Sequence, residues 1–221
     1  MTQPRYEIGN LSDHLDWTAD EWTELAELWD DLPLDSFMGD RGTYRRRRFA
    51  TVSYRAGAVE VLEQRPFLQS MEINKLNGGV PRTFEPVDQR LFKSPIVQRA
   101  LAHFADRTGA TAWTVNVHQH RITATWTESG RPTPEGAHRD GVDHVAMILM
   151  DRADVAGGVS TIHDLAQAPV TTHCLTRPGD YILLDDRTAL HSVSPLEPAE
   201  GCAQGRRDML FFEFAQQEAQ A

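Results

Sequence analysis

The sequence predicts a mainly β protein of the α+β class, with a jelly-roll core buttressed by N-terminal helices. Apolar residues recur at helical spacing early in the chain, and short alternating segments separated by Gly and Pro fill the later part. Many short strands joined by tight turns are typical of jelly rolls, and preceding helices pack on their outside. The 221 residues suit a single domain over 1–221, with a helical part at about 17–108 and the core at about 111–214.

Composition narrows the class of protein. The chain is 40% hydrophobic, which is enough for a real core, and its net charge is −10 without a basic stripe, so we expect no nucleic-acid partner. It has no signal-like N-terminus and no apolar run of about 18 residues, so we expect a cytoplasmic protein that does not bind membranes. Its two cysteines, Cys174 and Cys202, are expected to stay reduced. The sequence leaves open whether the protein forms a homodimer.

The helical part begins at a clear signal. Thr18 can cap a helix, and Glu21 stands at the capping-box position before an apolar stripe that packs on a sheet. A second helix is predicted over 94–108, ending at Gly109. Between them, residues 66–92 are rich in Gly and Pro, which indicates a loop of the kind that folds over a site.

An arginine-rich strand is predicted over residues 44–49. Arg45 and Arg47 would share one face with Phe49, because side chains two apart on a strand point the same way. In an acidic protein such a cluster can bind an anion, so Arg45 and Arg47 are candidates for a substrate carboxylate. The alternative is a basic edge exposed to solvent.

The predicted core strands follow one another closely. Residues 112–125 alternate, with Gln119 and Arg121 on the face of Trp113, Val115 and Val117, and with His118, His120 and Ile122 on the other. Further strands are expected over 142–150, with the metal-binding segment from 138 leading into it, and over 159–162, 175–184 and 209–214.

The stretch before the strand at 142–150 contains His138-Arg139-Asp140. On an extended chain the His138 imidazole and the Asp140 carboxylate can converge on one point. His191, which lies 51 residues after Asp140 and follows another predicted strand, can complete a set of two histidines and one carboxylate. This set leaves three positions open on Fe(II) and is the ligand set of non-haem iron oxygenases. A second pair, His14-Leu15-Asp16, has no strand after it and is given no metal role.

Arg207 completes the series. It lies 16 residues after His191, at the start of the last predicted strand. A guanidinium matches a carboxylate through two parallel hydrogen bonds, which is what a small dicarboxylate cosubstrate needs.

These residues together resemble a known family. The matching motifs, between about residues 39 and 214, are Pro134-Glu135-Gly136-x-His138-x-Asp140-Gly141, Gly157-Gly158-x-Ser160, His191-x-Val193-x-Pro195, Arg207-Asp208, Tyr44–Phe49, Arg82-x-Phe84 and His118-Gln119-x-Arg121. The sequence is similar in these to the bacterial 2-oxoglutarate/Fe(II) dioxygenases that include L-isoleucine 4-hydroxylase. It departs from the isoleucine enzyme in the 66–92 loop and in residues 128–137.

The resemblance implies a double-stranded β-helix of the cupin type that uses Fe(II), 2-oxoglutarate and O₂ to hydroxylate a C–H bond in the side group of a free L-amino acid, with release of succinate and CO₂. It implies that His138, Asp140 and His191 bind iron. It implies that Arg207, with Ser194, binds 2-oxoglutarate; Arg206 competes for this role, although Arg207-Asp208 matches the Arg-Asp pair of the family.

A free amino acid also needs partners for its own carboxylate and ammonium groups. The candidates for the carboxylate are Arg45, Arg47 and Arg121, and Gln119 could contact either group. Two alternatives remain open: an oxygenase of another small metabolite or of a carrier- or peptide-bound residue, and a metal-binding jelly-roll module without turnover.

Overall fold

The computed structural model describes residues 3–73, 76 and 78–216. The helices are α1 (Ala19–Ala26), α2 (Gln89–Lys93) and α3 (Pro95–Thr108), with 3-10 turns η1 (Leu11–Asp13) and η2 (Glu27–Trp29). The strands are β1 (Tyr6–Asn10), β2 (Arg45–Arg55), β3 (Ala58–Val61), β4 (Ala112–Thr125), β5 (His144–Ala153), β6 (Val155–Gly157), β7 (Val159–His163), β8 (Pro169–Cys174), β9 (Asp180–Asp185), β10 (Leu190–Val193), β11 (Leu196–Pro198) and β12 (Gln204–Gln216).

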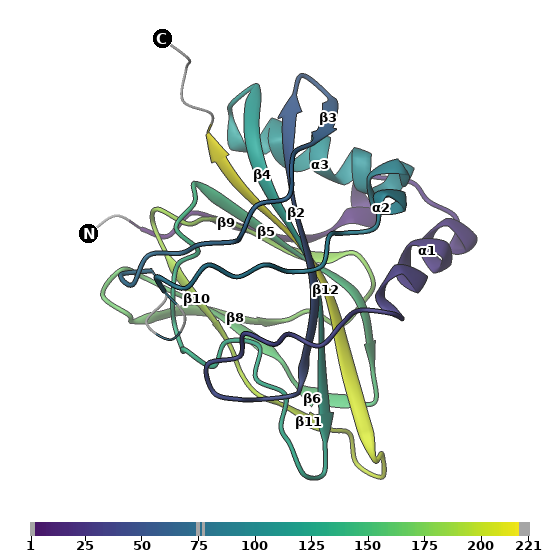
Figure 1. The fold of residues 1–221 in the computed structure, drawn as a ribbon, viewed down its shortest axis with the longest axis vertical. Coiled ribbons are helices and arrows are strands. Elements are labelled where there is room, and N and C mark those ends of the chain that lie inside the picture. Colours follow the sequence, from purple (N-terminus) through teal and green to yellow (C-terminus); the bar gives the residue numbers. More distant parts are fainter. Residues whose placement is uncertain (1–2, 74–75, 77, 217–221) are drawn as a thin grey trace.

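Antiparallel sheets dominate the fold. The major sheet has seven strands in the order β1-β9-β5-β12-β4-β2-β3, and smaller sheets have the orders β10-β7-β8 and β11-β6. Figure 1 shows the helices grouped on one side of the strands, away from β8 and β10. The predicted fold class, a jelly-roll core buttressed by helices, is confirmed.

One core lies between the major sheet and the helices. Trp29, Leu101 and Phe104 from the helical side pack there with Tyr181 and Phe212 from the sheet, and all five are at most 1% exposed. A second core lies inside the barrel, where Ile162 of β7 packs with residues of β5 and β9. The apolar run along β5 is continuous because alternate residues enter the two cores: Val145, Met147 and Leu149 face inward, and Ala146, Ile148 and Met150 face the helices.

The start of α1 follows the predicted capping box. Glu21 N–H donates to the Thr18 hydroxyl at 3.2 Å, and Thr18 N–H donates to the Glu21 carboxylate at 2.8 Å. At the end of α3, Gly109 has a φ of 81°, a conformation that glycine adopts without steric cost.

Trp29 ties the helical side to the sheet, and its replacement by alanine should be strongly destabilising. The indole is fully buried and donates to the carbonyl oxygens of His120 (3.1 Å) and Met209 (3.3 Å). Trp29→Ala should lower the free energy of unfolding by about 3–5 kcal/mol in denaturant titrations. The control is Trp126→Ala at a side chain 72% exposed, which should change it by less than about 0.5 kcal/mol. Similar small effects at both positions would contradict this assignment.

The structure differs from the sequence-based expectation in three elements. Tyr6–Asn10 forms an unexpected strand, β1, which pairs with β9 at the edge of the major sheet. The strand expected to run on from His138 begins only at His144; residues 138–143 are a bridge and bends. The last strand starts earlier than predicted, at Gln204, so Arg207 lies within it.

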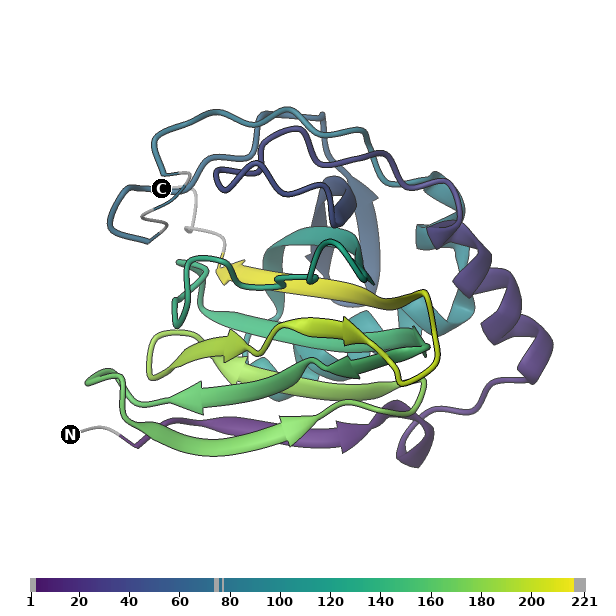
Figure 2. The same cartoon turned by 90° about the horizontal axis from the view of Figure 1, so that it is seen from below.

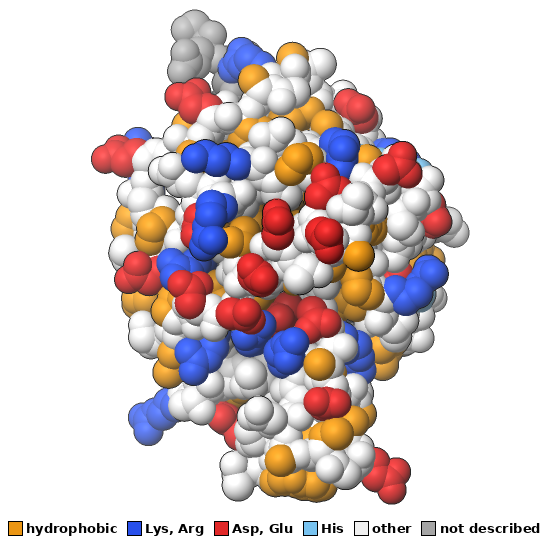
Figure 3. All heavy atoms as spheres, turned by 90° about the vertical axis from the view of Figure 1, so that its right-hand side faces the viewer, with side chains coloured by type: hydrophobic (Ala, Val, Ile, Leu, Met, Phe, Trp, Pro, Cys, Tyr) orange, Lys and Arg blue, Asp and Glu red, His pale blue; other side chains and the backbone are white. Residues whose placement is uncertain are grey.

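The exterior is mixed in charge. On the face over α1 and α2, acidic and basic side chains are interspersed (Figure 3). Among the described residues, none of the helices combines the length and apolar character needed to span a bilayer.

Candidate active site

A cavity opens on the inner face of the major sheet. Alternate residues of three neighbouring strands point into it, as the two-residue period of a strand requires: Arg45 and Arg47 from β2; His118, His120 and Ile122 from β4; Arg207, Met209, Phe211 and Glu213 from β12. His191 and Val193 of β10 line it as well, together with residues between Pro132 and Asp140. Phe67, Gln69 and Arg82 come from the long loop expected to fold over a site. In Figure 2 this loop and the segment before β2 run together along one edge of the strands.

His138, Asp140 and His191 converge in this cavity. The backbones of His138 and His191 pair through two hydrogen bonds of 3.0 and 2.9 Å, which places the two side chains next to each other. Each imidazole Nε2 lies 3.6 Å from an oxygen of the Asp140 carboxylate. The two nitrogens and the oxygen lie within 4.8 Å of one another, which fits a single ion.

Asp186, which was not identified from the sequence, shapes the turn that presents Asp140. Its buried carboxylate accepts backbone N–H groups of Asp140 (3.0 Å), Gly141 (2.8 Å) and Val142 (3.2 Å). Gly141 takes a φ of 84° in this turn. Asp186 therefore orients the Asp140 carboxylate toward the histidines.

The protonation of the three residues suits a divalent cation. Burial opposes ionisation of Asp140, but His191 and His138 hold the pKa of its carboxyl below the usual range. Burial and His138 lower the pKa of His191 to about 4, so its imidazole is neutral. Burial would lower the pKa of His138, but Asp140 raises it to about 9. His138 Nδ1 donates to the Gly136 carbonyl oxygen at 3.0 Å, so its Nε2 becomes a ligand once an ion displaces the second proton.

Arg207 lies in the same cavity without a countercharge. It is 2% exposed, and among the described residues no carboxylate forms an ion pair with it and nothing accepts from its Nε. Burial and the nearby Arg152 lower the pKa of Arg207 to about 10, so the guanidinium is still charged at neutral pH. A buried cation of this kind requires an anionic ligand to offset its desolvation.

The two other residues weighed for the cosubstrate are placed differently. The Ser194 hydroxyl accepts the Val159 N–H at 3.0 Å, and the residue is not part of the cavity lining. Arg206 points out of the barrel and pairs with Asp151 at 2.6 Å on the surface.

Arg45 and Arg47 line the cavity, and both lie near Asp35. Arg45 Nε donates to the Asp35 carboxylate at 2.8 Å, whereas Arg47 NH1 lies 3.9 Å from it. The Arg47 guanidinium lies 3.9 Å from the centre of the Phe84 ring and contacts His118 Nδ1 at 2.6 Å.

Arg121 and Gln119 lie on the opposite face of β4, under the helices. Arg121 donates to both oxygens of Asp208, at 2.8 and 2.7 Å, and to Asp30 at 3.4 Å. The Gln119 amide donates to the Leu28 carbonyl oxygen at 3.2 Å. Neither belongs to the cavity lining.

Several lining residues were not assigned a role from the sequence. His118 Nε2 lies 2.9 Å from the Glu213 carboxylate, and Arg82 donates to the Gln69 amide oxygen at 2.8 Å. Burial lowers the pKa of His118 and, further, that of His120, so both rings are neutral at neutral pH. The alternation of β4 indicates that His118 and His120 share a face, but only the fold shows that this face lines the cavity.

Comparison with known proteins identifies the family. Residues 26–213 match the family model described as 2OG-Fe dioxygenase. The protein belongs to the 2OG-Fe dioxygenase family. Enzymes of this family use Fe(II), 2-oxoglutarate and O₂, and the His-Asp-His group supplies the donor set that such iron requires. No protein with a curated function matches the sequence.

Solved structures agree with this assignment. A bsmA homolog from Methylobium petroleophilum PM1 is 33% identical, with a TM-score of 0.79 over 91% of this protein and 83% of its own length. IDO from Bacillus thuringiensis is 16% identical, with a TM-score of 0.74 over 96% of this protein and 93% of its own length. TqaL, an Fe(II)/α-ketoglutarate-dependent dioxygenase, is 20% identical, with a TM-score of 0.75 over 98% of this protein and 84% of its own length. The likeness to IDO and TqaL concerns the fold.

Proposed function

We propose that this enzyme hydroxylates an unactivated C–H bond in the side group of a free L-amino acid and releases succinate and CO₂ from 2-oxoglutarate. In this proposal His138, Asp140 and His191 hold Fe(II), and Arg207 holds the far carboxylate of 2-oxoglutarate. The observation that carries it is the presence, in one cavity, of the convergent triad, the uncompensated Arg207 and a further group of charged residues at Arg47, Arg82 and Glu213.

Bound iron supplies the oxidising chemistry that couples breakdown of 2-oxoglutarate to insertion of oxygen into a C–H bond. The protein contributes binding and orientation. Arg207 fixes one end of the cosubstrate, and the cavity walls position the C–H bond and keep water from the reacting atoms.

Arg82 is our candidate for the substrate carboxylate. It is 2% exposed, its Nε has no hydrogen-bond partner among the described residues, and its terminal nitrogen donates to the neutral Gln69 amide rather than to a carboxylate. Its guanidinium lies 4.9 Å from the centre of the Phe67 ring, which fixes its plane. Arg47, less neutralised than Arg45, lies in the same lining and can share the carboxylate.

Charge balance favours a substrate without net charge. The cavity is lined by four arginines and three carboxylates, and Asp35 behind Arg45 supplies a fourth carboxylate. Fe(II) and the 2-oxoglutarate dianion cancel each other. A zwitterionic amino acid with an uncharged side chain preserves this balance, and apolar walls at Ile122, Met147, Val193 and Phe211 favour an aliphatic or aromatic side chain.

The proposal is tested by measuring succinate formed by iron-loaded enzyme with 2-oxoglutarate and each of the 20 amino acids, citrulline and ornithine. We expect uncharged apolar amino acids to stimulate turnover most, with a hydroxylated product detected by mass spectrometry. Slow succinate formation that no free amino acid stimulates would overturn the proposed substrate and favour another metabolite or a carrier-bound residue. No 2-oxoglutarate consumption under any condition would reject an active oxygenase.

Replacing Arg82 should affect the two substrates differently. Arg82→Met should raise KM for the amino acid about 10- to 100-fold, since a hydrogen bond to a charged group contributes about 1.5–3 kcal/mol, while KM for 2-oxoglutarate stays within about threefold. Steady-state kinetics with each substrate varied in turn provide the measurement. Arg65→Met, at an exposed arginine before the same loop, is the control and should change neither constant. Equal increases in both constants would place Arg82 elsewhere in the mechanism.

A further inference from the structure

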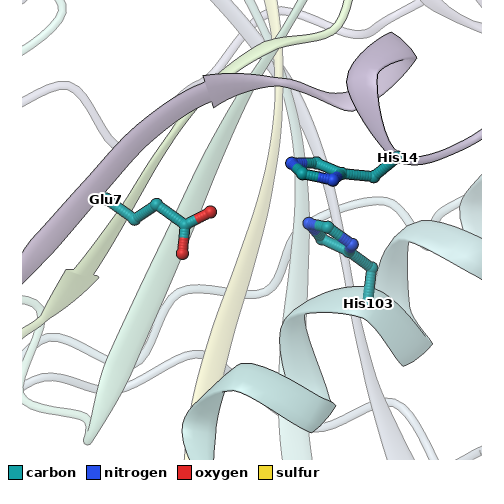
Figure 4. A group of neighbouring side chains, drawn as sticks. All are labelled: Glu7, His14 and His103. Atoms are coloured by element: carbon teal, nitrogen blue, oxygen red, sulfur yellow. The ribbon is translucent and has the colours of Figure 1, made fainter.

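Glu7, His14 and His103 form a second cluster of metal-type ligands, on the helical side of the major sheet. Glu7 lies on β1, His14 follows η1, and His103 lies on α3. One ligand atom from each residue lies within 4.8 Å of the others. Figure 4 shows the two imidazoles stacked, with a nitrogen of each turned toward the Glu7 carboxylate. None of these residues takes part in the proposed oxygenase site.

His103 gives the cluster an unsatisfied buried donor atom. The residue is 9% exposed, and its Nε2 has no hydrogen-bond partner among the described residues. Its ring centre lies 4.7 Å from that of His14. Buried ring nitrogens normally have a partner, so an unpartnered one that faces a histidine and a carboxylate indicates a missing ligand.

The neighbours hold the carboxylate in place. The Tyr181 hydroxyl donates to Glu7 Oε1, and Arg107 Nε lies 3.2 Å from both oxygens. Burial opposes ionisation of Glu7, but Tyr181 and Arg107 keep the pKa of its carboxyl below the usual value. Burial, Arg107 and His14 lower the pKa of His103 to about 4, so its ring is neutral at neutral pH. An ionised carboxylate and neutral imidazoles are the forms that bind metals.

We propose that Glu7, His14 and His103 bind a divalent transition metal ion of the zinc type. Two imidazole nitrogens and one carboxylate oxygen are a donor set that zinc accepts, with water completing the coordination. Because the three residues come from β1, the segment after η1 and α3, the ion ties the N-terminal edge strand to a helix that packs on the sheet.

Arg107 opposes this binding in a way that can be tested. Its NH1 lies 3.2 Å from His103 Nδ1, an arrangement in which the ring proton sits on Nε2. For Nε2 to bind a metal, the proton must move to Nδ1, and Arg107 must donate instead to the His103 carbonyl oxygen, 3.4 Å from NH1. Removing this cation should therefore tighten binding.

The experiment is calorimetric titration of the metal-free protein with Zn²⁺. Because the oxygenase triad also takes zinc, we expect two ions per wild-type molecule, one per molecule in His14→Ala and one per molecule in His138→Ala. Arg107→Gln should keep two ions and bind the second site roughly tenfold more tightly. The control His173→Ala, at a histidine of β8 outside both clusters, should keep two.

Hydrogen exchange supplies a readout that does not depend on activity. Zinc should slow amide exchange in Tyr6–Asn10 of wild-type protein and of His138→Ala, but not of His14→Ala. His14 is exposed, so its replacement should leave the fold and oxygenase turnover unchanged. One zinc ion per wild-type molecule, or the same stoichiometry and exchange in wild type and His14→Ala, would overturn this proposal and leave the proposed oxygenase function untouched.

Discussion

Asp140→Asn is expected to lower Fe(II) affinity by at least about 100-fold and to remove turnover. The substitution keeps the shape of the side chain but removes the one negative charge that the two imidazoles share, with Nε2 atoms 3.6 Å from its oxygens. Loss of even an outer hydrogen-bond partner of a metal ligand costs about 10- to 100-fold in affinity or activity, and loss of a charged ligand should cost at least as much.

Co²⁺ titration followed by the thermal unfolding midpoint measures this effect without turnover. A bound ion stabilises the folded protein by mass action, so Co²⁺ should raise the midpoint of wild-type protein and not that of Asp140→Asn. The control is Asp143→Asn, because Asp143 lies three residues away and accepts the Gln216 N–H at 2.8 Å outside the cavity. Equal Co²⁺ stabilisation of wild type and Asp140→Asn would remove Asp140 from the ligand set.

The fold could be predicted where local patterns agree with tertiary packing. The Thr18 capping box, the helix that ends at Gly109 and the alternation of β4 all depend on neighbours in sequence. Strand β1 could not be predicted, because its short polar segment extends only by pairing with β9, some 170 residues away. The segment at 138–143 also depends on a distant partner, since the backbone of His138 pairs with His191.

The triad and Arg207 could be proposed from sequence because their order and spacing are distinctive. The substrate side of the cavity was harder. Alternation separates Gln119 and Arg121 from His118 and His120, but it does not say which face of β4 the helices cover. Trp29 and Leu28 pack over the face of Gln119, so the histidine face is the one left to line the cavity.

Asp186 and Arg82 show why other roles stay invisible in sequence. Asp186 acts only through three backbone N–H groups more than 40 residues earlier in the chain. Arg82 faces the cavity because its backbone forms two hydrogen bonds with Phe67, which closes the base of a long loop. Neither partner follows from a local motif.

Arg207→Met is expected to raise KM for 2-oxoglutarate by at least about tenfold, and by on the order of 100-fold if the guanidinium holds both carboxylate oxygens. A hydrogen bond to a charged group contributes about 1.5–3 kcal/mol, and 1.36 kcal/mol corresponds to a factor of ten. KM for the amino acid should change little, because Arg207 and Arg82 come from different parts of the sequence and serve different anions in our proposal.

The stability of the ligand-free protein should move in the opposite direction. Arg207 is a buried cation without an ion-pair partner among the described residues, so its removal should leave the free energy of unfolding unchanged or raise it. 2-Oxoglutarate with Co²⁺ should raise the unfolding midpoint of wild-type protein beyond the effect of Co²⁺ alone, and this increment should vanish in Arg207→Met.

The neighbouring arginine provides the matched control. Arg206 lies one residue earlier on the same strand, points outward and pairs with Asp151 at the surface. Arg206→Met should keep KM within about twofold and the free energy of unfolding within about 0.5 kcal/mol, as exposed ion pairs contribute little. Because adjacent residues of a strand face opposite sides, a larger effect on KM for 2-oxoglutarate at Arg206 than at Arg207 would mean that the cosubstrate binds outside the cavity, against the proposed site.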